Sequence, residues 1–145
     1  TKLAELCENI NQRRKSLSKT DIIECYKLSF DTHFHLATIH PWADGNGRMS
    51  RLLMNRLQFE LDIIPFNINK DHKTEYIEAF IATRENDDIE LFRGFMFDEH
   101  IRNLEQTIRN YRDSPSDCVN KKLQDFSRSF LLTLYFEHFL LNQTI

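Results

Sequence analysis

The sequence predicts an all-α protein, and three observations support that fold class. Glycine and proline number only three each among 145 residues, whereas an all-β sandwich needs a turn about every 8–12 residues. Apolar residues recur every three or four positions along most of the chain, which is the period of one helix face. No stretch shows the strict alternation of a half-buried strand. We therefore expect a helical bundle, and the length is that of about one domain.

The first two helices are predicted before the proline at position 41. A short helix is indicated by three apolar residues at helical spacing, Leu3, Leu6 and Ile10. The polar run 11–19 is typical of a solvated helix end and a loop. Ser18 or Thr20 is expected to cap the next helix, with Asp21 in its first turn. This long helix has one apolar face, formed by Ile23, Tyr26, Phe30, Phe34 and Ala37. It should end near Ile39, because a residue before proline resists the α conformation.

Further helices follow a loop of about eight residues. The helix after that loop is marked by Leu53, Leu57 and Leu61. Another is marked by Tyr76, Ile77, Phe80 and Ile81, and is followed by a polar connection over 85–88. A longer helix is marked by Phe97, Ile101, Leu104, Ile108 and Tyr111, with Gly94 a weak point near its start. The run 112–117, which contains Pro115, is the best linker candidate, and an aromatic-rich last helix is expected over 123–141.

Composition and charge exclude several classes of protein. Hydrophobic residues make up 41% and charged residues 28%, with a net charge of -3, so nothing indicates a disordered chain or a nucleic-acid-binding surface. The cysteines, Cys7, Cys25 and Cys118, are odd in number and form no CxxC pair, which favours a reducing cytoplasm. No apolar run reaches the ~20 residues of a membrane span, and we expect no signal peptide. The chain begins at Thr1, which suggests a fragment.

The loop before the leucine-patterned helix concentrates chemically useful residues. Gly45 and Gly47 allow a backbone N–H to approach a ligand closely, and the helix that follows offers free N–H donors to an anion. Arg48 and Arg51 share one face of that helix end and can form forked hydrogen bonds with phosphate. Asp44 could bind a Mg²⁺ that bridges phosphates. His40 stands at the far edge of the loop, where a neutral imidazole could accept a proton.

Each of these residues alone has an ordinary structural explanation. Asp-Gly and Asn-Gly pairs form turns, and an arginine at a helix start is usually solvated. A turn, however, needs neither the histidine nor the paired arginines. A base, a metal ligand, an anion cradle and two arginines within residues 40–51 together indicate transfer chemistry on a nucleotide phosphate.

The run His-Pro-Trp-Ala-Asp-Gly-Asn-Gly-Arg-Met-Ser-Arg over residues 40–51 resembles the signature of the Fic (filamentation induced by cAMP) family. That signature reads His-x-Phe-x-Asp/Glu-Gly-Asn-Gly-Arg-x-x-Arg. The single departure is Trp42 in place of phenylalanine, and we expect the indole to remain an aromatic anchor in the core. The helical pattern over about 20–97 is also similar to the family's all-α core. The resemblance implies one Fic domain over 1–145, with C-terminal helices over about 98–145.

The resemblance also implies an activity and a role for each residue. Most Fic proteins transfer AMP from ATP to a protein hydroxyl. His40 would then deprotonate the target Ser, Thr or Tyr, and Asp44 would coordinate Mg²⁺. The anion hole would be lined by Gly45, Asn46 and Gly47, while Arg48 would clamp the β-phosphate side and Arg51 would reach the γ-phosphate. The family's phosphorylating branch, the Doc toxins, has Lys at the position of Gly47, which weakens that alternative here.

Two alternatives and one regulatory expectation stay open. The chain could be an auto-inhibited or AMP-removing enzyme, or a nucleotide-binding regulatory module without transferase activity; an intact His40 argues against the second. Some Fic proteins carry an inhibitory helix, whose glutamate would be Glu137 paired with Arg51. The family's β-hairpin flap cannot be placed in residues 1–19. Expected partners are ATP and an unidentified protein, with no nucleic acid and no membrane, and self-association is left open.

The remaining histidines are predicted to be structural. His33 and His35 lie two residues apart and therefore on different helix faces, which favours core or surface positions over a metal pair. His72 and His100 have no partner at metal-ligand spacing.

Overall fold

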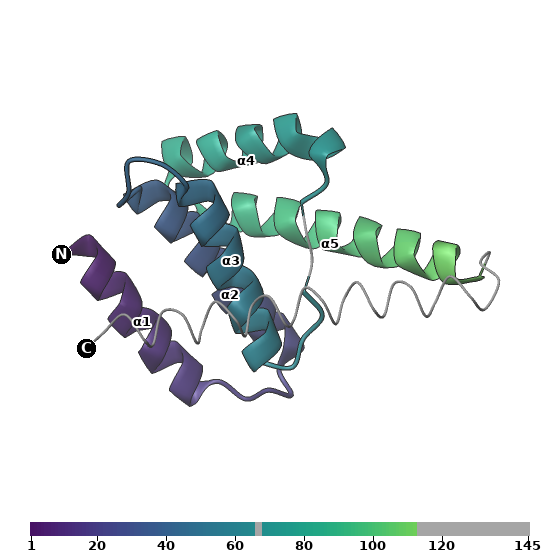
Figure 1. Cartoon of the computed structure of the whole chain (residues 1–145), viewed down its shortest axis with the longest axis horizontal. Helices are drawn as coiled ribbons and strands as arrows, with labels where there is room; N and C mark the ends of the chain where they lie inside the picture. Colours follow the sequence, from purple (N-terminus) through teal and green to yellow (C-terminus); the bar gives the residue numbers. More distant parts are fainter. Residues whose placement is uncertain (66–67, 113–145) are drawn as a thin grey trace. The chain divides into compact units, whose positions relative to one another are not determined.

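The computed structural model describes residues 1–65 and 68–112, which form five α-helices and no strand (Figure 1). In chain order these are α1 (Lys2–Ser16), α2 (Ile22–Ile39), α3 (Asn46–Glu60), α4 (Lys73–Asn86) and α5 (Ile89–Arg112), with a short 3₁₀ helix, η1 (Lys70–His72), before α4. The all-α prediction is therefore confirmed for this part of the chain. The predicted last helix over 123–141 lies outside the described residues.

The chain divides into two units, Thr1–Asn103 and Leu104–Ile145, and the second is described only over residues 104–112. The expectation of one domain over 1–145 therefore stays a prediction. None of the helices among the described residues is long and apolar enough to cross a membrane.

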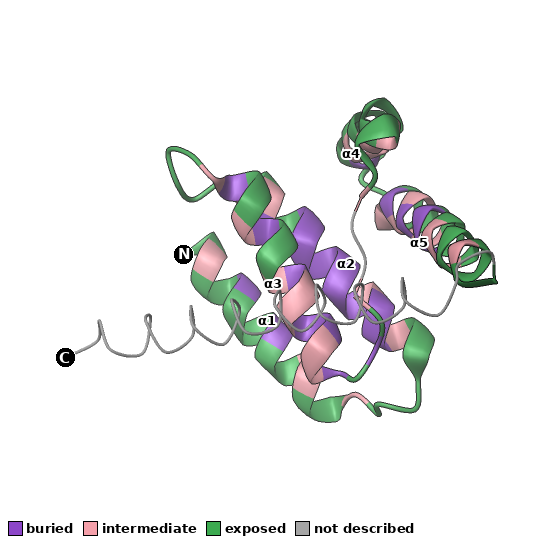
Figure 2. Ribbon diagram, turned by 45° about the vertical axis from the view of Figure 1, so that its right-hand side comes forward, coloured by how far each residue is buried: buried purple, intermediate pink, exposed green. Residues whose placement is uncertain are grey.

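Helix α2 supplies most of the core of the first unit. Ten of its 18 residues are buried (Figure 2), as expected of a helix covered on several sides. One cluster of apolar side chains joins α2 to α3 and α5 through Phe30, Phe34, Met54, Phe92 and Met96. A second cluster joins it to α1 and α3 through Leu6, Ile10, Leu36 and Leu57. The N-terminal helix thus packs by the apolar face that its sequence predicts.

The ends of α2 set the direction in which the chain enters the glycine-rich loop. Asp21 caps the helix, because its side chain accepts a hydrogen bond from the backbone N–H of Glu24 at 3.2 Å. The prediction of Ser18 or Thr20 as the cap was wrong, since their hydroxyls bond to each other at 2.7 Å. The C-terminal end falls at Ile39 as predicted, and His40 adopts the left-handed conformation with φ 52°.

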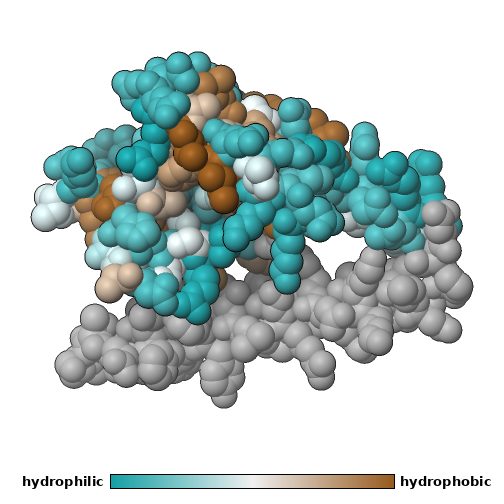
Figure 3. All heavy atoms as spheres, turned by 90° about the horizontal axis from the view of Figure 1, so that it is seen from above, coloured by the Kyte–Doolittle hydropathy of each residue, from teal (hydrophilic) through white to brown (hydrophobic). Residues whose placement is uncertain are grey.

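Helices α4 and α5 differ in detail from the sequence prediction. The residues expected to connect them are partly helical, because α4 continues to Asn86 and α5 begins at Ile89, well before Phe97. Tyr76 and Phe80 of α4 pack on the core. Two other apolar residues of α4, Ile77 and Ile81, are exposed. Figure 3, which views the molecule from above Figure 1, shows hydrophobic surface bordered by hydrophilic surface.

Two buried carboxylates join distant parts of the first unit. Asp31 of α2 accepts hydrogen bonds from Arg13 of α1 at 2.7 Å and from Arg93 of α5 at 2.6 and 2.8 Å. Glu99 of α5 accepts one from the backbone of Asn69 at 2.9 Å and pairs with Nδ1 of His72 at 2.7 Å. Buried charges are tolerated when they are paired and hydrogen-bonded in this way. These contacts therefore hold the helices that support the loop.

Candidate functional site

The loop over residues 40–45 is six residues long and is held by one asparagine. Asn46, the first residue of α3, is buried, and its side-chain oxygen accepts from the Trp42 N–H at 3.0 Å while its amide donates to the Trp42 carbonyl at 2.6 Å. This double clamp fixes the loop against the helix start. The sequence did not predict it, although an Asx residue beside a helix start is a known source of local backbone hydrogen bonds.

The glycine that ends the loop, Gly45, and the glycine in the first turn of α3, Gly47, differ in backbone conformation. Gly45 has φ 84°, and its carbonyl accepts from the N–H groups of Arg48 at 3.0 Å and Met49 at 2.9 Å. Such a φ is costly for any residue with a Cβ. Gly47 has no positive φ, and a Cβ added there would meet only the Arg51 guanidinium, at an ordinary 3.6 Å. The fold therefore requires glycine at position 45 but not at 47.

The N-terminus of α3 is open to an anion. Gly45 provides no side-chain cap, and no acidic residue lies in the first helical turn. The first N–H groups of a helix have no partner within the helix and carry the positive end of its dipole. Arg48 and Arg51 follow at once and are both exposed. An exposed helix start without a cap, next to two arginines, is a strong candidate for phosphate binding.

The acidic and basic groups of the loop remain accessible to solvent. Asp44 accepts from the Gly45 N–H at 2.6 Å through one oxygen and from Arg48 at 3.3 Å through the other. Its side chain is 93% exposed and that of Arg48 is 76% exposed. An exposed i,i+4 ion pair contributes little to stability. Asp44 and Arg48 can therefore separate and bind a ligand instead, at a small cost in free energy.

Asp44 fits a Mg²⁺ ion that arrives with a nucleotide. Among the described residues, no group of three or more His, Cys, Asp and Glu side chains could hold a metal by itself. Magnesium, however, is usually bound by one or two carboxylates together with substrate phosphates and water. A single exposed carboxylate beside a helix N-terminus meets that requirement.

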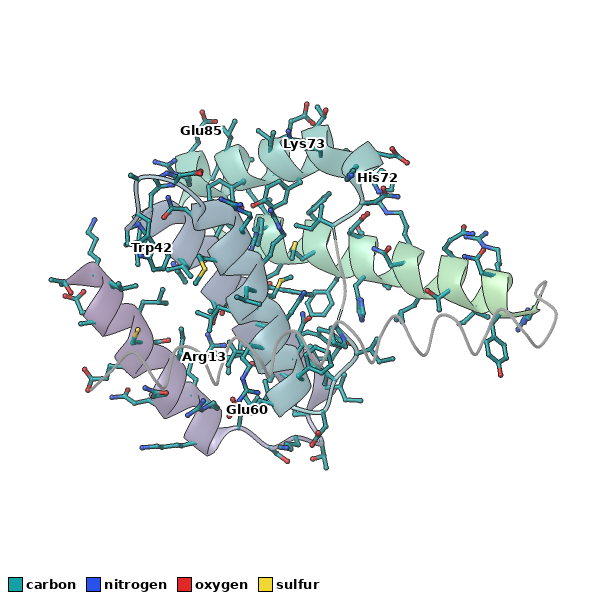
Figure 4. All side chains as sticks on the ribbon, viewed as in Figure 1. Arg13, Trp42, Glu60, His72, Lys73 and Glu85 are labelled. Atoms are coloured by element: carbon teal, nitrogen blue, oxygen red, sulfur yellow. The ribbon has the colours of Figure 1, made fainter. Side chains whose placement is uncertain are left out.

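His40 and Trp42 occupy the entrance of the loop. His40 is exposed at the C-terminal end of α2, and its N–H donates to the Leu36 carbonyl at 3.2 Å. Trp42, labelled in Figure 4, is 42% exposed. The expectation that its indole would be an aromatic anchor in the core was wrong. Its backbone, rather than its ring, is what the fold uses, through the clamp with Asn46.

Behind the loop lies a buried pair that the sequence did not predict. Nε2 of His33 is 3.0 Å from the Tyr76 hydroxyl. Burial, assisted by the nearby positive charge of Arg51, lowers the pKa of His33 to about 4. The prediction for the two neighbouring histidines is confirmed, because His33 is buried and His35 is exposed. His33 is therefore neutral at physiological pH and lies close to the charge of Arg51.

Part of the chain is similar to a known protein family. Residues 1–58 match the family model described as Fic/DOC family. The matched segment includes α1, α2, the loop and most of α3, so it contains every loop residue discussed above. The match begins before the core expected over about 20–97 and ends within that range, at Gln58.

Several curated relatives that the chain matches carry the name "Protein adenylyltransferase Fic". The protein from Aedes aegypti is 40% identical over 79 residues, which are 54% of this chain and 16% of the relative. That from Culex quinquefasciatus is 41% identical over 73 residues, or 50% of this chain and 14% of the relative. That from Drosophila mojavensis is 41% identical over 66 residues, or 46% and 13%. The chain thus spans a small part of these relatives. No solved structure gave a significant match.

The sequence also suggests an inhibitory residue, Glu137. Glu137 falls outside the described residues, so its pairing with Arg51 stays a prediction.

Proposed function

We propose that the loop between α2 and α3 transfers AMP from ATP to a side-chain hydroxyl of a target protein. The observation that carries the proposal is the open N-terminus of α3, which has no side-chain cap, no acidic residue in its first turn and two exposed arginines. This end of the helix suits a polyphosphate. The relatives' name, protein adenylyltransferase, supports AMP as the transferred group.

Each residue of the loop and of the start of α3 has its own role in the proposed transfer. His40 accepts the proton of the target hydroxyl, whose oxygen then forms a bond to the α-phosphorus of ATP. The bond from that phosphorus to the oxygen bridging to the β-phosphate breaks, and pyrophosphate leaves. The backbone N–H groups of residues 45–47 and the guanidinium of Arg48 stabilise the negative charge on the phosphates, and Arg51 binds the γ-phosphate. The absence of a side chain at Gly47 leaves room for the phosphates.

Asp44 would hold the Mg²⁺ that accompanies ATP, and the ion would neutralise charge on the phosphates when bound. The present contact between Asp44 and Arg48 keeps both groups at the mouth of the loop. The proposed setting is a reducing cytoplasm, because Cys7 and Cys25 are free thiols.

One variant separates the proposal from its alternatives. His40→Ala should lower transfer of labelled AMP to proteins of a lysate by about 10²–10⁴-fold, the usual effect of losing a general base. ATP affinity, measured by calorimetry with Mg²⁺, should stay the same because the helix N-terminus is untouched. His35→Ala, which removes an exposed histidine of α2 five residues before His40, is the matched control and should change neither value.

The outcomes distinguish three functions. Unchanged transfer in His40→Ala would contradict the assignment of the base. A wild-type chain that binds ATP but transfers nothing would favour the regulatory module or an auto-inhibited enzyme. A chain that releases AMP from modified protein would favour the AMP-removing alternative.

A further inference from the structure

The tryptophan of the loop keeps its ring in water, although the ring is large and mostly apolar. Of the aromatic residues that the structure describes, only Trp42 and Tyr111 are exposed. Trp42 is also the single tryptophan of the chain, and the two apolar clusters of the described residues do not include it. One exposed apolar side chain is ordinary by itself. Its surroundings therefore decide whether this ring can bind a ligand.

The main chain that carries the indole is held on both sides. The Trp42 N–H donates to the side-chain oxygen of Asn46 at 3.0 Å, and the Trp42 carbonyl accepts from the Asn46 amide at 2.6 Å. Asn46 is itself only 3% exposed, so water competes little for these two hydrogen bonds. An aromatic side chain has two torsions to fix, and on a rigid backbone it binds at a small cost in conformational entropy. The ring is thus a preorganised contact surface.

The same clamp sets the ring beside the start of α3. Asn46 is the first residue of that helix, so one hydrogen bond separates the main chain of Trp42 from the helix end that we propose as the phosphate site. A ligand that uses both features needs several phosphates and a flat aromatic group within one small molecule. A nucleoside triphosphate has this composition, whereas inorganic polyphosphate has only the phosphates.

We propose that the base of ATP stacks on the indole of Trp42 while the phosphates occupy the start of α3. The inference rests on the proposed function, because it uses the same phosphate site. Every base has a π-face, so stacking on an aromatic side chain tolerates all of them. The ring therefore distinguishes a nucleotide from free polyphosphate and distinguishes adenine from guanine only weakly. A side chain of the target protein is the alternative occupant of the ring, and it predicts a different result.

Two ligands, measured on the wild type and on ring variants, test the proposal. Calorimetry gives the affinities of ATP and of inorganic tripolyphosphate, each with Mg²⁺. The wild type should bind ATP more tightly than tripolyphosphate. Trp42→Leu should lower the affinity for ATP about 5–150-fold, which corresponds to the ~1–3 kcal/mol of one stacked base, and should leave the affinity for tripolyphosphate unchanged. Trp42→Phe should restore most of the affinity for ATP, because a smaller ring still stacks.

The emission of the single tryptophan reports the contact directly. All indole emission of the chain comes from the loop, because Trp42 is the only tryptophan. ATP and GTP with Mg²⁺ should quench this emission, with saturation at the concentrations that calorimetry gives for binding, whereas tripolyphosphate should not. Tyr111→Leu removes the other exposed aromatic ring of the described residues and is the matched control. It should change neither the affinity for ATP nor the quenching.

The variants should fold, because the clamp with Asn46 uses only the main chain of Trp42, and thermal unfolding checks this. An unchanged affinity for ATP in Trp42→Leu would overturn the inference. If that variant also lost AMP transfer to protein, the ring would belong to the target's site instead. An equal loss of affinity for ATP and tripolyphosphate would show that the ring shapes the loop without stacking, and would overturn the inference too.

Failure of the proposed function gives a different pattern from failure of the stacking. A wild-type chain that binds neither ligand has no phosphate site, which would contradict both. A wild-type chain that binds ATP and tripolyphosphate equally well has the phosphate site without the stacking, which would contradict only the inference about Trp42. Transfer of AMP enters neither the calorimetry nor the emission measurement, so a chain without transferase activity could still show the stacking.

Discussion

The buried charges between α1, α2 and α5 and the exposed charges of the glycine-rich loop use the same residue types for different purposes. The side chain of Asp31 is 6% exposed and bonds two arginines, whereas that of Asp44 is 93% exposed and touches one. Burial raises the pKa of Asp31, but Arg93 and Arg13 outweigh it and hold that pKa below its usual value. Burial and the number of partners, rather than residue type, separate charges that hold the fold from charges that can bind a ligand.

The largest expected effect contrasts the two aspartates. Asp31→Ala should lower the free energy of unfolding by about 3–5 kcal/mol, because it leaves two arginines without their buried partner. Asp44→Ala, the same substitution in the loop, should change it by less than about 0.5 kcal/mol. Denaturant unfolding of both variants measures the difference. Equal losses would mean that the loop charges also hold the fold.

A second contrast concerns pH and the two histidines of α2. The pKa of His33 is about 4 in the folded chain and about 6.5 when unfolded. The unfolded chain therefore binds more protons below pH 6.5, so stability is complete above that pH and is lost as the pH falls toward 4. The loss attributable to this residue should reach about 3 kcal/mol. Burial also lowers the pKa of His100 and acts in the same direction.

Conservative variants isolate the contribution of His33. His33→Gln keeps a hydrogen-bonding group near Tyr76 but cannot titrate, so part of the pH dependence between 6.5 and 4 should disappear. His35→Gln, two residues further along and exposed, should leave the pH profile unchanged. Identical profiles for all three chains would show that the buried imidazole is not the source of the acid sensitivity.

The third contrast is between binding and stability at the loop. Arg48→Ala should weaken ATP·Mg²⁺ binding about 10–100-fold, which is the usual value of hydrogen bonds to a charged group. The free energy of unfolding should hardly change, because the ion pair with Asp44 that Arg48 loses is exposed. Arg84→Ala on α4 is the matched control and should not alter ATP affinity. Wild-type affinity in Arg48→Ala would place the phosphates elsewhere.

The smallest effects distinguish the two loop glycines. Gly45→Ala should destabilise the fold by about 1–2 kcal/mol, since φ 84° is unfavourable for alanine. Gly47→Ala should stabilise it by about 0.5 kcal/mol, because alanine favours a helix and meets no close contact. Gly47→Lys should keep the fold and weaken ATP binding by filling the cradle. Thermal unfolding and calorimetry check both positions, and a destabilised Gly47→Ala would show that the fold needs this glycine too.

The sequence predicted what depends on neighbouring residues. The period of apolar residues predicted α1, α2 and α4, Pro41 predicted the end of α2, and the run 40–51 predicted a loop that opens a helix. It did not predict contacts between distant residues. Nothing near Asp31 indicates Arg93, 62 residues away, and nothing near His72 indicates Glu99.

The exposure of Trp42 was missed for a related reason. An aromatic residue before a helix usually packs inward, but here the two hydrogen bonds from Asn46 hold the backbone of Trp42 and the ring is not needed as an anchor. Local patterns therefore predict where the candidate site residues lie along the chain. Burial, which decides their roles, is set by the packing of α1, α4 and α5 around α2 and needs the structure.

The position of a radioactive label tests the central claim most directly, that the open end of α3 serves AMP transfer. The chain is incubated with Mg²⁺, a lysate and ATP labelled on either the α- or the γ-phosphate. Transfer of AMP predicts labelled protein from α-labelled ATP only, and loss of that signal in His40→Ala. Protein labelled from γ-labelled ATP would contradict the account, because the loop would then transfer the terminal phosphate instead.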